Sequence, residues 1–112
     1  MELFLRVFTS CSDDSVSLYL LKRLCNALSE CADAIPSNPN RYWKIPEMYE
    51  FTFRLMPANM NVFKKIINFS PNGWVHMGSN SDCSSVWNVA DGSSFLVPEV
   101  QWAELQLYET AP

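Results

Sequence analysis

Residues 2–34, ELFLRVFTSCSDDSVSLYLLKRLCNALSECADA, decide the fold because they place a strand directly before a helix. Alternate residues of 2–9 form two largely apolar faces, which is typical of a strand inside a sheet. The run Ser15–Ala34 contains neither glycine nor proline and repeats apolar residues at spacings of three and four. Residues 10–14, SCSDD, supply candidate capping residues before it, and Pro36 follows it. This stretch therefore predicts a strand followed by a long helix.

The rest of the chain predicts a second helix and four further strands. Residues 36–46 contain three prolines and are expected to form a surface loop, in which Tyr42 and Trp43 contact the edge of the core. The expected strands are residues 47–56, 74–78, 84–89 and 100–108, and the expected helix is capped by Asn59 or Asn61 and carries Val62, Phe63, Ile66, Ile67 and Phe69. The order is then β-α-β-α-β-β-β. It predicts a single α+β domain over residues 1–112, with an antiparallel sheet of about five strands, two helices on one face and a ferredoxin-like order.

Composition excludes several classes of function. The chain has 112 residues, of which 48% are apolar, so it can form one domain with a real core. Its formal charge of −4 argues against a nucleic-acid-binding surface. The three glycines form no phosphate loop, and the single histidine removes most zinc and catalytic constellations. We therefore expect a binding protein with no catalytic residue, no cofactor and no metal.

The four cysteines are expected to be free thiols. Cys11, Cys25, Cys31 and Cys83 form no C-x-x-C pair. The N-terminus does not have the pattern of a signal peptide, and no apolar stretch approaches the roughly 18 residues of a membrane span. These features predict a cytoplasmic protein with reduced thiols, and one structural disulfide is the alternative.

Charge is unevenly distributed along the chain. Residues 1–65 contain seven acids and all eight bases, whereas residues 66–112 contain five acids and no lysine or arginine. The second segment also contains Trp74, Trp87 and Trp102. Carboxylates interleaved with tryptophan suit a basic partner protein, because charge steers the encounter and aromatic side chains supply buried contact area. The alternative is that the acids are ordinary solvated residues on a sheet whose tryptophans face the helices.

Other candidate chemistry is weaker. Cys83 and His76 lie near the same expected turn, so they could form a nucleophile and base, or bind a metal together with Asp82. Glu47 and Glu50 have an odd spacing, which places them on opposite faces of a strand. The aromatic residues Tyr42, Trp43, Phe51, Phe53, Phe63 and Phe69 could line a small-molecule pocket, although core packing accounts for them better.

One segment carries a resemblance to a known family. Residues 83–107, CSSVWNVADGSSFLVPEVQWAELQL, and within them SSVWN at 84–88 and FLVPEVQWAEL at 95–105, resemble the C-terminal part of small immunity proteins. Such proteins are encoded beside bacterial polymorphic toxins, including those of contact-dependent growth inhibition. The resemblance covers roughly a quarter of the chain.

The resemblance implies a cytosolic, non-catalytic protein that binds one cognate toxin domain and blocks its active site or substrate cleft. Many such toxins are nucleases, such as RNases, whose basic clefts would attract an acidic inhibitor. The candidate toxin-binding residues are Asp82, Asp91, Glu99, Glu104, Trp87 and Trp102. The expected partner is a toxin with a basic surface, without direct contact to nucleic acid or membrane, and the free protein is a monomer or a homodimer.

The alternative function is a ferredoxin-like regulatory module that binds a small ligand and pairs sheet to sheet as a homodimer. An apolar sheet face exposed in the monomer would favour this second function.

Overall fold

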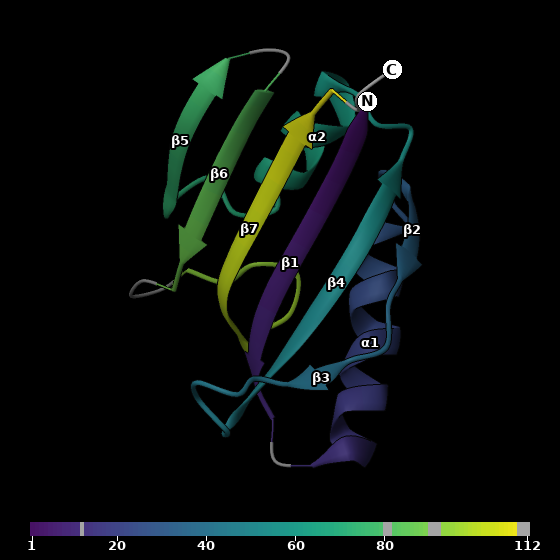
Figure 1. Ribbon diagram of the computed structural model, residues 1–112, viewed down its shortest axis with the longest axis vertical. Helices are drawn as coiled ribbons and strands as arrows, with labels where there is room; N and C mark the ends of the chain where they lie inside the picture. The colour runs from purple at the N-terminus through teal and green to yellow at the C-terminus, as the bar shows by residue number, and fades with distance from the viewer. Residues whose placement is uncertain (12, 80–81, 90–92, 110–112) are drawn as a thin grey trace.

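The computed structural model describes residues 1–11, 13–79, 82–89 and 93–109. The fold is α+β, with a seven-stranded antiparallel sheet and two helices (Figure 1). The elements in chain order are β1 (Glu2–Ser10), α1 (Asp14–Leu28), β2 (Asp33–Pro36), β3 (Asn40–Arg41), β4 (Met48–Met56), α2 (Met60–Ile67), β5 (Trp74–Ser79), β6 (Asp82–Asn88) and β7 (Val100–Tyr108).

Strand β1 occupies the middle of the sheet, between β4 and β7. In this register Leu5 lies opposite Phe53 of β4 and Leu105 of β7, and all three side chains are fully buried. Successive side chains of a strand point to opposite faces, so the alternating apolar positions of these strands combine into one buried surface. The core therefore lies against one face of the sheet.

Both helices pack on that face. Helix α1 begins where the carboxylate of Asp13 accepts a hydrogen bond from the Val16 amide at 2.9 Å, and α2 begins in the same way at Asn59. The helices contribute buried side chains to the same core as the strands, and these side chains are Leu20, Leu24 and Leu28 of α1 and Val62, Phe63 and Ile66 of α2. No described helix is long and apolar enough to cross a membrane.

The opposite face of the sheet is called the open face below. No helix among the described residues covers it, and Figure 1 views the molecule from this side, with α1 and α2 behind the strands. Its side chains alternate with those of the core and are Glu2, Phe4, Arg6, Phe8, Met48, Glu50, Thr52, Arg54, Val75, Met77, Asp82, Ser84, Val86, Trp102, Glu104, Gln106 and Tyr108. Most of them are half-buried or exposed.

The predicted first helix extends six residues too far at its C-terminal end. It ends at Leu28 instead of Ala34, because Ser29 caps it and residues 33–36 pair with β4 as strand β2. Strand β3, Asn40–Arg41, also pairs with β4, although it lies in the segment predicted to be a loop. Proline is tolerated on an edge strand, so Pro36 does not prevent this pairing.

The two additional strands correct the predicted sheet. It has seven strands instead of about five, in the order β2-β4-β1-β7-β6-β5, with β3 beside β4. Helix α1 carries the chain from β1 to β2, which lies two strands away with β4 between them. The α+β class, the antiparallel sheet and the two helices are confirmed, whereas the ferredoxin-like order is not.

Candidate functional site

A pocket lined by aromatic side chains lies on the open face. Phe8 of β1 is opposite Trp102 of β7 in the register, and their ring centroids are 5.0 Å apart. The ring of Tyr42 also packs against Phe8, with the two ring centroids 4.7 Å apart. The cavity has a volume of about 260 Å³, and its lining consists of Arg6, Phe8, Tyr42, Ile45, Met48 and Trp102. These six residues are called the aromatic pocket below.

One wall of the aromatic pocket comes from the loop between β3 and β4. The amide of Tyr42 donates to the carbonyl of Met48 at 2.8 Å, which folds the loop back over the end of the sheet. Trp43, the next residue, is 79% exposed and does not contact the core edge as the sequence predicted. The loop therefore directs Tyr42 inward and Trp43 outward.

The charges next to the aromatic pocket are partly neutralised within the chain. The Arg6 guanidinium lies 3.1 Å from the Glu50 carboxylate, and their hydrogen bond raises the pKa of Arg6. The same guanidinium lies over the Phe8 ring, 4.9 Å from its centroid. Glu104 is opposite Arg6 on β7 but forms no ion pair with any residue that the structure describes. One carboxylate beside the aromatic pocket therefore has no salt-bridge partner.

Three of the predicted toxin-binding residues lie on the open face. Trp102 and Glu104 are two residues apart and lie on the same face of β7. Asp82 is opposite Tyr108 at the far end of the β6–β7 ladder. Four residues of strand separate the positions of Asp82 and Glu104, which corresponds to roughly 13 Å. Trp102 and Glu104 are thus brought together, and Asp82 stands apart from them.

The other predicted residues do not join this group. Trp87 is fully buried in the core, where its indole nitrogen donates to Ser70 Oγ at 3.1 Å and to the Asn72 carbonyl at 3.0 Å. Glu99 precedes β7 and accepts a hydrogen bond from Arg23 of α1 at 2.7 Å. Asp91 lies outside the described residues. Trp87 is therefore a core residue, and Glu99 already forms an ion pair with Arg23 of the same chain.

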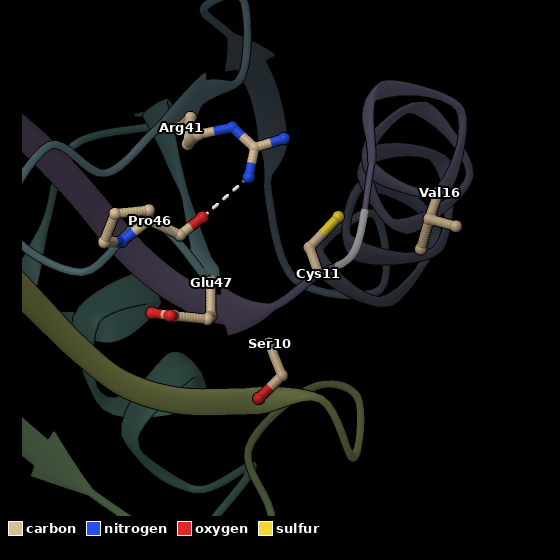
Figure 2. Close-up of a pocket in the computed structure, with 6 residues that line it drawn as sticks. All are labelled: Ser10, Cys11, Val16, Arg41, Pro46 and Glu47. Atoms are coloured by element: carbon tan, nitrogen blue, oxygen red, sulfur yellow. Dashed lines mark hydrogen bonds between the residues drawn. The ribbon is translucent and has the colours of Figure 1, made fainter.

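A second, larger cavity lies at the end of β1, next to the start of α1 (Figure 2). It has a volume of about 650 Å³ and is lined by Ser10, Cys11, Val16, Arg41, Pro46 and Glu47. Arg41 donates to the Pro46 carbonyl at 2.7 Å and to the Tyr49 hydroxyl at 3.1 Å, and that hydroxyl donates to Asp14. These bonds tie the β3–β4 loop to the beginning of α1.

The thiols are free and protonated at neutral pH. All four cysteines are unpaired, as the sequence predicted, with Cys11 buried and the other three half-buried. Burial raises the pKa of each of the four thiols. Because the thiolate is the nucleophile, none of these cysteines has the low pKa of an activated one.

We expect alkylation of the folded protein by iodoacetamide at about pH 7 to be slower than that of the same chain unfolded in guanidinium chloride, because a raised pKa lowers the thiolate fraction. The rate should still rise as the pH passes the ordinary thiol value of 9.0. Mass spectrometry of the labelled peptides gives the rate for each cysteine. A rate that reaches its plateau below about pH 8 at any position would contradict this assignment.

His76 pairs with a serine instead of with Cys83. Its Nδ1 lies 2.5 Å from the Oγ of Ser85, its partner across the β5–β6 ladder. Ser85 is almost fully buried, so its hydroxyl is not accessible to a substrate. No group of three or more His, Cys, Asp or Glu side chains in the described ranges is arranged to hold a metal ion.

Several residues of the aromatic pocket were not identified by sequence reasoning. Phe8, Ile45 and Met48 carried no signal for a site, and Tyr42 was assigned to core packing. The even positions of residues 2–9 carry Phe4 and Phe8 besides the charged Glu2 and Arg6, so the second face of this strand is also partly apolar. That second apolar face was the one available signal for this pocket.

Comparisons with known proteins give no family for the chain. No family model matches the sequence, and no curated protein or solved structure matches it significantly.

Proposed function

We propose that this protein binds a cognate bacterial toxin domain and neutralises it by covering its active site or substrate cleft with the open face. The observation that carries the proposal is the aromatic pocket beside Glu104, a carboxylate without a salt-bridge partner among the described residues. Aromatic side chains are typical of the energetically important centre of a protein interface, and a charge beside them can steer and orient the partner. The resemblance of residues 83–107 to immunity proteins supplies the class of partner.

Charge supports a basic partner. The open face carries the carboxylates of Glu104 and Asp82, which form no ion pair within the described part of the chain. A nuclease toxin, such as an RNase, has a cleft lined by lysine and arginine that bind phosphate, and these side chains would pair with such carboxylates. Opposite charges accelerate the encounter, and pairs that become desolvated and hydrogen-bonded contribute most to affinity.

A binding role also agrees with the chemistry of the side chains. The four thiols have raised pKa values, and Ser85, the partner of His76, is buried. We therefore assign no catalytic residue, and we expect the double variant Cys83→Ala, His76→Ala to neutralise the toxin as the parent protein does. The free thiols are in keeping with action in the reducing cytoplasm.

The test is protection by charge-reversed variants. Glu104→Lys should weaken binding to the cognate toxin domain by about tenfold or more, because it replaces attraction by repulsion next to the aromatic pocket. Binding is measured by isothermal titration calorimetry, and protection is measured by growth of cells that express both proteins.

Glu30→Lys is the matched control. Glu30 is exposed beyond the end of α1, away from the open face, and the substitution changes the net charge by the same amount. Equal loss in both variants would show that only net charge matters, and full affinity of Glu104→Lys would refute docking through the open face. Failure of the parent protein to bind the toxin domain would refute the proposed function itself.

A homodimer with a regulatory, small-ligand-binding role is the second candidate. Val75 and Met77 on the open face of β5 are 61% and 56% exposed, and such apolar area favours a sheet-to-sheet contact between two copies. Sedimentation velocity over a hundredfold range of concentration distinguishes the two candidates. A sedimentation coefficient that stays at the monomer value removes this alternative.

A further inference from the structure

The aromatic pocket has the dimensions of a site for one side chain. Its volume of about 260 Å³ is comparable to that of a single large aromatic residue. Phe8, Trp102 and Tyr42 line it, with the rings of Trp102 and Tyr42 tilted by 56° and 58° to that of Phe8. Ile45, which is 45% exposed, lies at the rim.

The charge inside the aromatic pocket excludes an ionic occupant. A cationic group would meet the guanidinium of Arg6, which already lies over Phe8 at 4.9 Å. An anionic group would have to compete for that guanidinium with the carboxylate of Glu50, which holds it at 3.1 Å. A neutral aromatic ring meets neither difficulty, because it can pack edge-to-face against the tilted rings and beside the neutralised guanidinium.

Glu104 places a second requirement on the partner, which is a basic group next to the aromatic pocket. It lies two residues from Trp102 on the same face of β7, a separation of roughly 7 Å. Its carboxylate has no ion pair within the described residues, so it can accept a basic group there. Two side chains spaced by two residues in an extended peptide have the same separation.

We infer that the aromatic pocket receives one aromatic side chain of the partner, with an arginine or lysine of the partner about 7 Å away on Glu104. This inference rests on the proposed function, because it specifies which groups of the partner the open face recognises. The aromatic side chain would be the anchor of the interface, and the basic one would set its orientation.

The probe is the tripeptide acetyl-Trp-Gly-Arg-amide, titrated into the ¹⁵N-labelled protein. We expect saturable shifts of the Trp102 indole N–H signal, with a Kd on the order of 1 mM. Acetyl-Ala-Gly-Arg-amide should bind at least about tenfold more weakly, because the pocket then stays empty. Acetyl-Trp-Gly-Glu-amide should bind roughly threefold to tenfold more weakly, and Glu104→Gln should remove that preference.

Two variants and one control test whether the peptide binds in the aromatic pocket. Ile45→Trp places an indole at the rim and should abolish binding while the sheet stays unchanged. Trp102→Ala has no indole signal at that position, so it is followed by the backbone amide signal of Phe8, and it should weaken binding by about tenfold. Trp43→Ala changes a ring that is 79% exposed outside the aromatic pocket and should bind as the parent does. Equal affinity of the tryptophan and alanine peptides, or unchanged binding by Ile45→Trp, would overturn the inference.

The outcome separates this inference from the proposed function. Toxin binding that tolerates Ile45→Trp would overturn the pocket assignment and leave neutralisation intact. A parent protein that binds the tryptophan peptide but no toxin domain would support the pocket and refute the proposed partner.

Discussion

Replacement of Trp87 by alanine is expected to lower the free energy of unfolding by about 4 kcal/mol. The indole is fully buried, lies 5.7 Å from the ring of Phe95, and donates hydrogen bonds to Ser70 and Asn72. The substitution leaves a cavity in the core and removes both of these hydrogen bonds, although the Asn72 carbonyl still accepts from Ser70 Oγ at 3.0 Å. Urea unfolding, followed by circular dichroism, measures the change in free energy.

Trp43→Ala is the control for this prediction. Trp43 is exposed, so its removal should change the free energy of unfolding by less than about 0.5 kcal/mol. A similarly small effect of Trp87→Ala would contradict the placement of Trp87 in the core. It would also make Trp87 available again as a residue that contacts a partner.

The second large loss of stability is expected when Gly78, near the end of β5, is replaced by alanine. Its φ of +89° lies in the left-handed region, and an added Cβ would approach the backbone oxygen of Asp82 to 2.2 Å. The neighbour is backbone and cannot turn aside, so the β5–β6 hairpin must shift. We expect Gly78→Ala to destabilise the protein by about 2 to 3 kcal/mol, measured by urea unfolding.

Ser84→Ala is a suitable comparison for Gly78→Ala, because Ser84 belongs to the same hairpin and lies on the open face. Its substitution should change the free energy of unfolding by no more than about 0.5 kcal/mol. If Gly78→Ala is as stable as Ser84→Ala, the backbone at residue 78 does not have the conformation described above.

Periodicity predicted the centre of the sheet well. Strands β4 and β7 alternate because one face of each is buried, whereas β1 was recognised by its two largely apolar faces. The expected ranges of all three agree with the structure to within one residue at either end. Caps were expected within residues 10–14 and at Asn59 or Asn61, and the structure uses Asp13 and Asn59; they could be located this closely because capping uses local hydrogen bonds. These features depend on neighbours in the sequence, which explains why they could be predicted.

The edge strands could not be predicted in this way. Residues 33–36 continue the helical pattern of α1 and end in a proline, yet they pair with β4, twenty residues later in the chain. That pairing is a tertiary interaction, and it overrides the local preference of a short segment. The two residues of β3 are too few to show any periodicity.

The candidate site was predicted in part, for similar reasons. The spacing of Trp102 and Glu104 places them on one face of a strand, and the structure does so. The segment around Trp87 has no clear apolar face, because serine, valine and asparagine surround the tryptophan, so its direction could not be decided. Phe8 and Tyr42 meet Trp102 only through the pairing of distant strands and the folded-back loop.

One group of hydrogen bonds within the chain would affect how fast the proposed complex dissociates. These are the bonds from Arg41 to Pro46 and Tyr49 and the bond from Tyr49 to Asp14. They fix the β3–β4 loop to the helix before any partner arrives, so Tyr42 already stands at the wall of the aromatic pocket. A preorganised loop loses little conformational entropy on binding, and more of the contact energy then appears as affinity. Such preorganisation generally lengthens the lifetime of a complex more than it accelerates association.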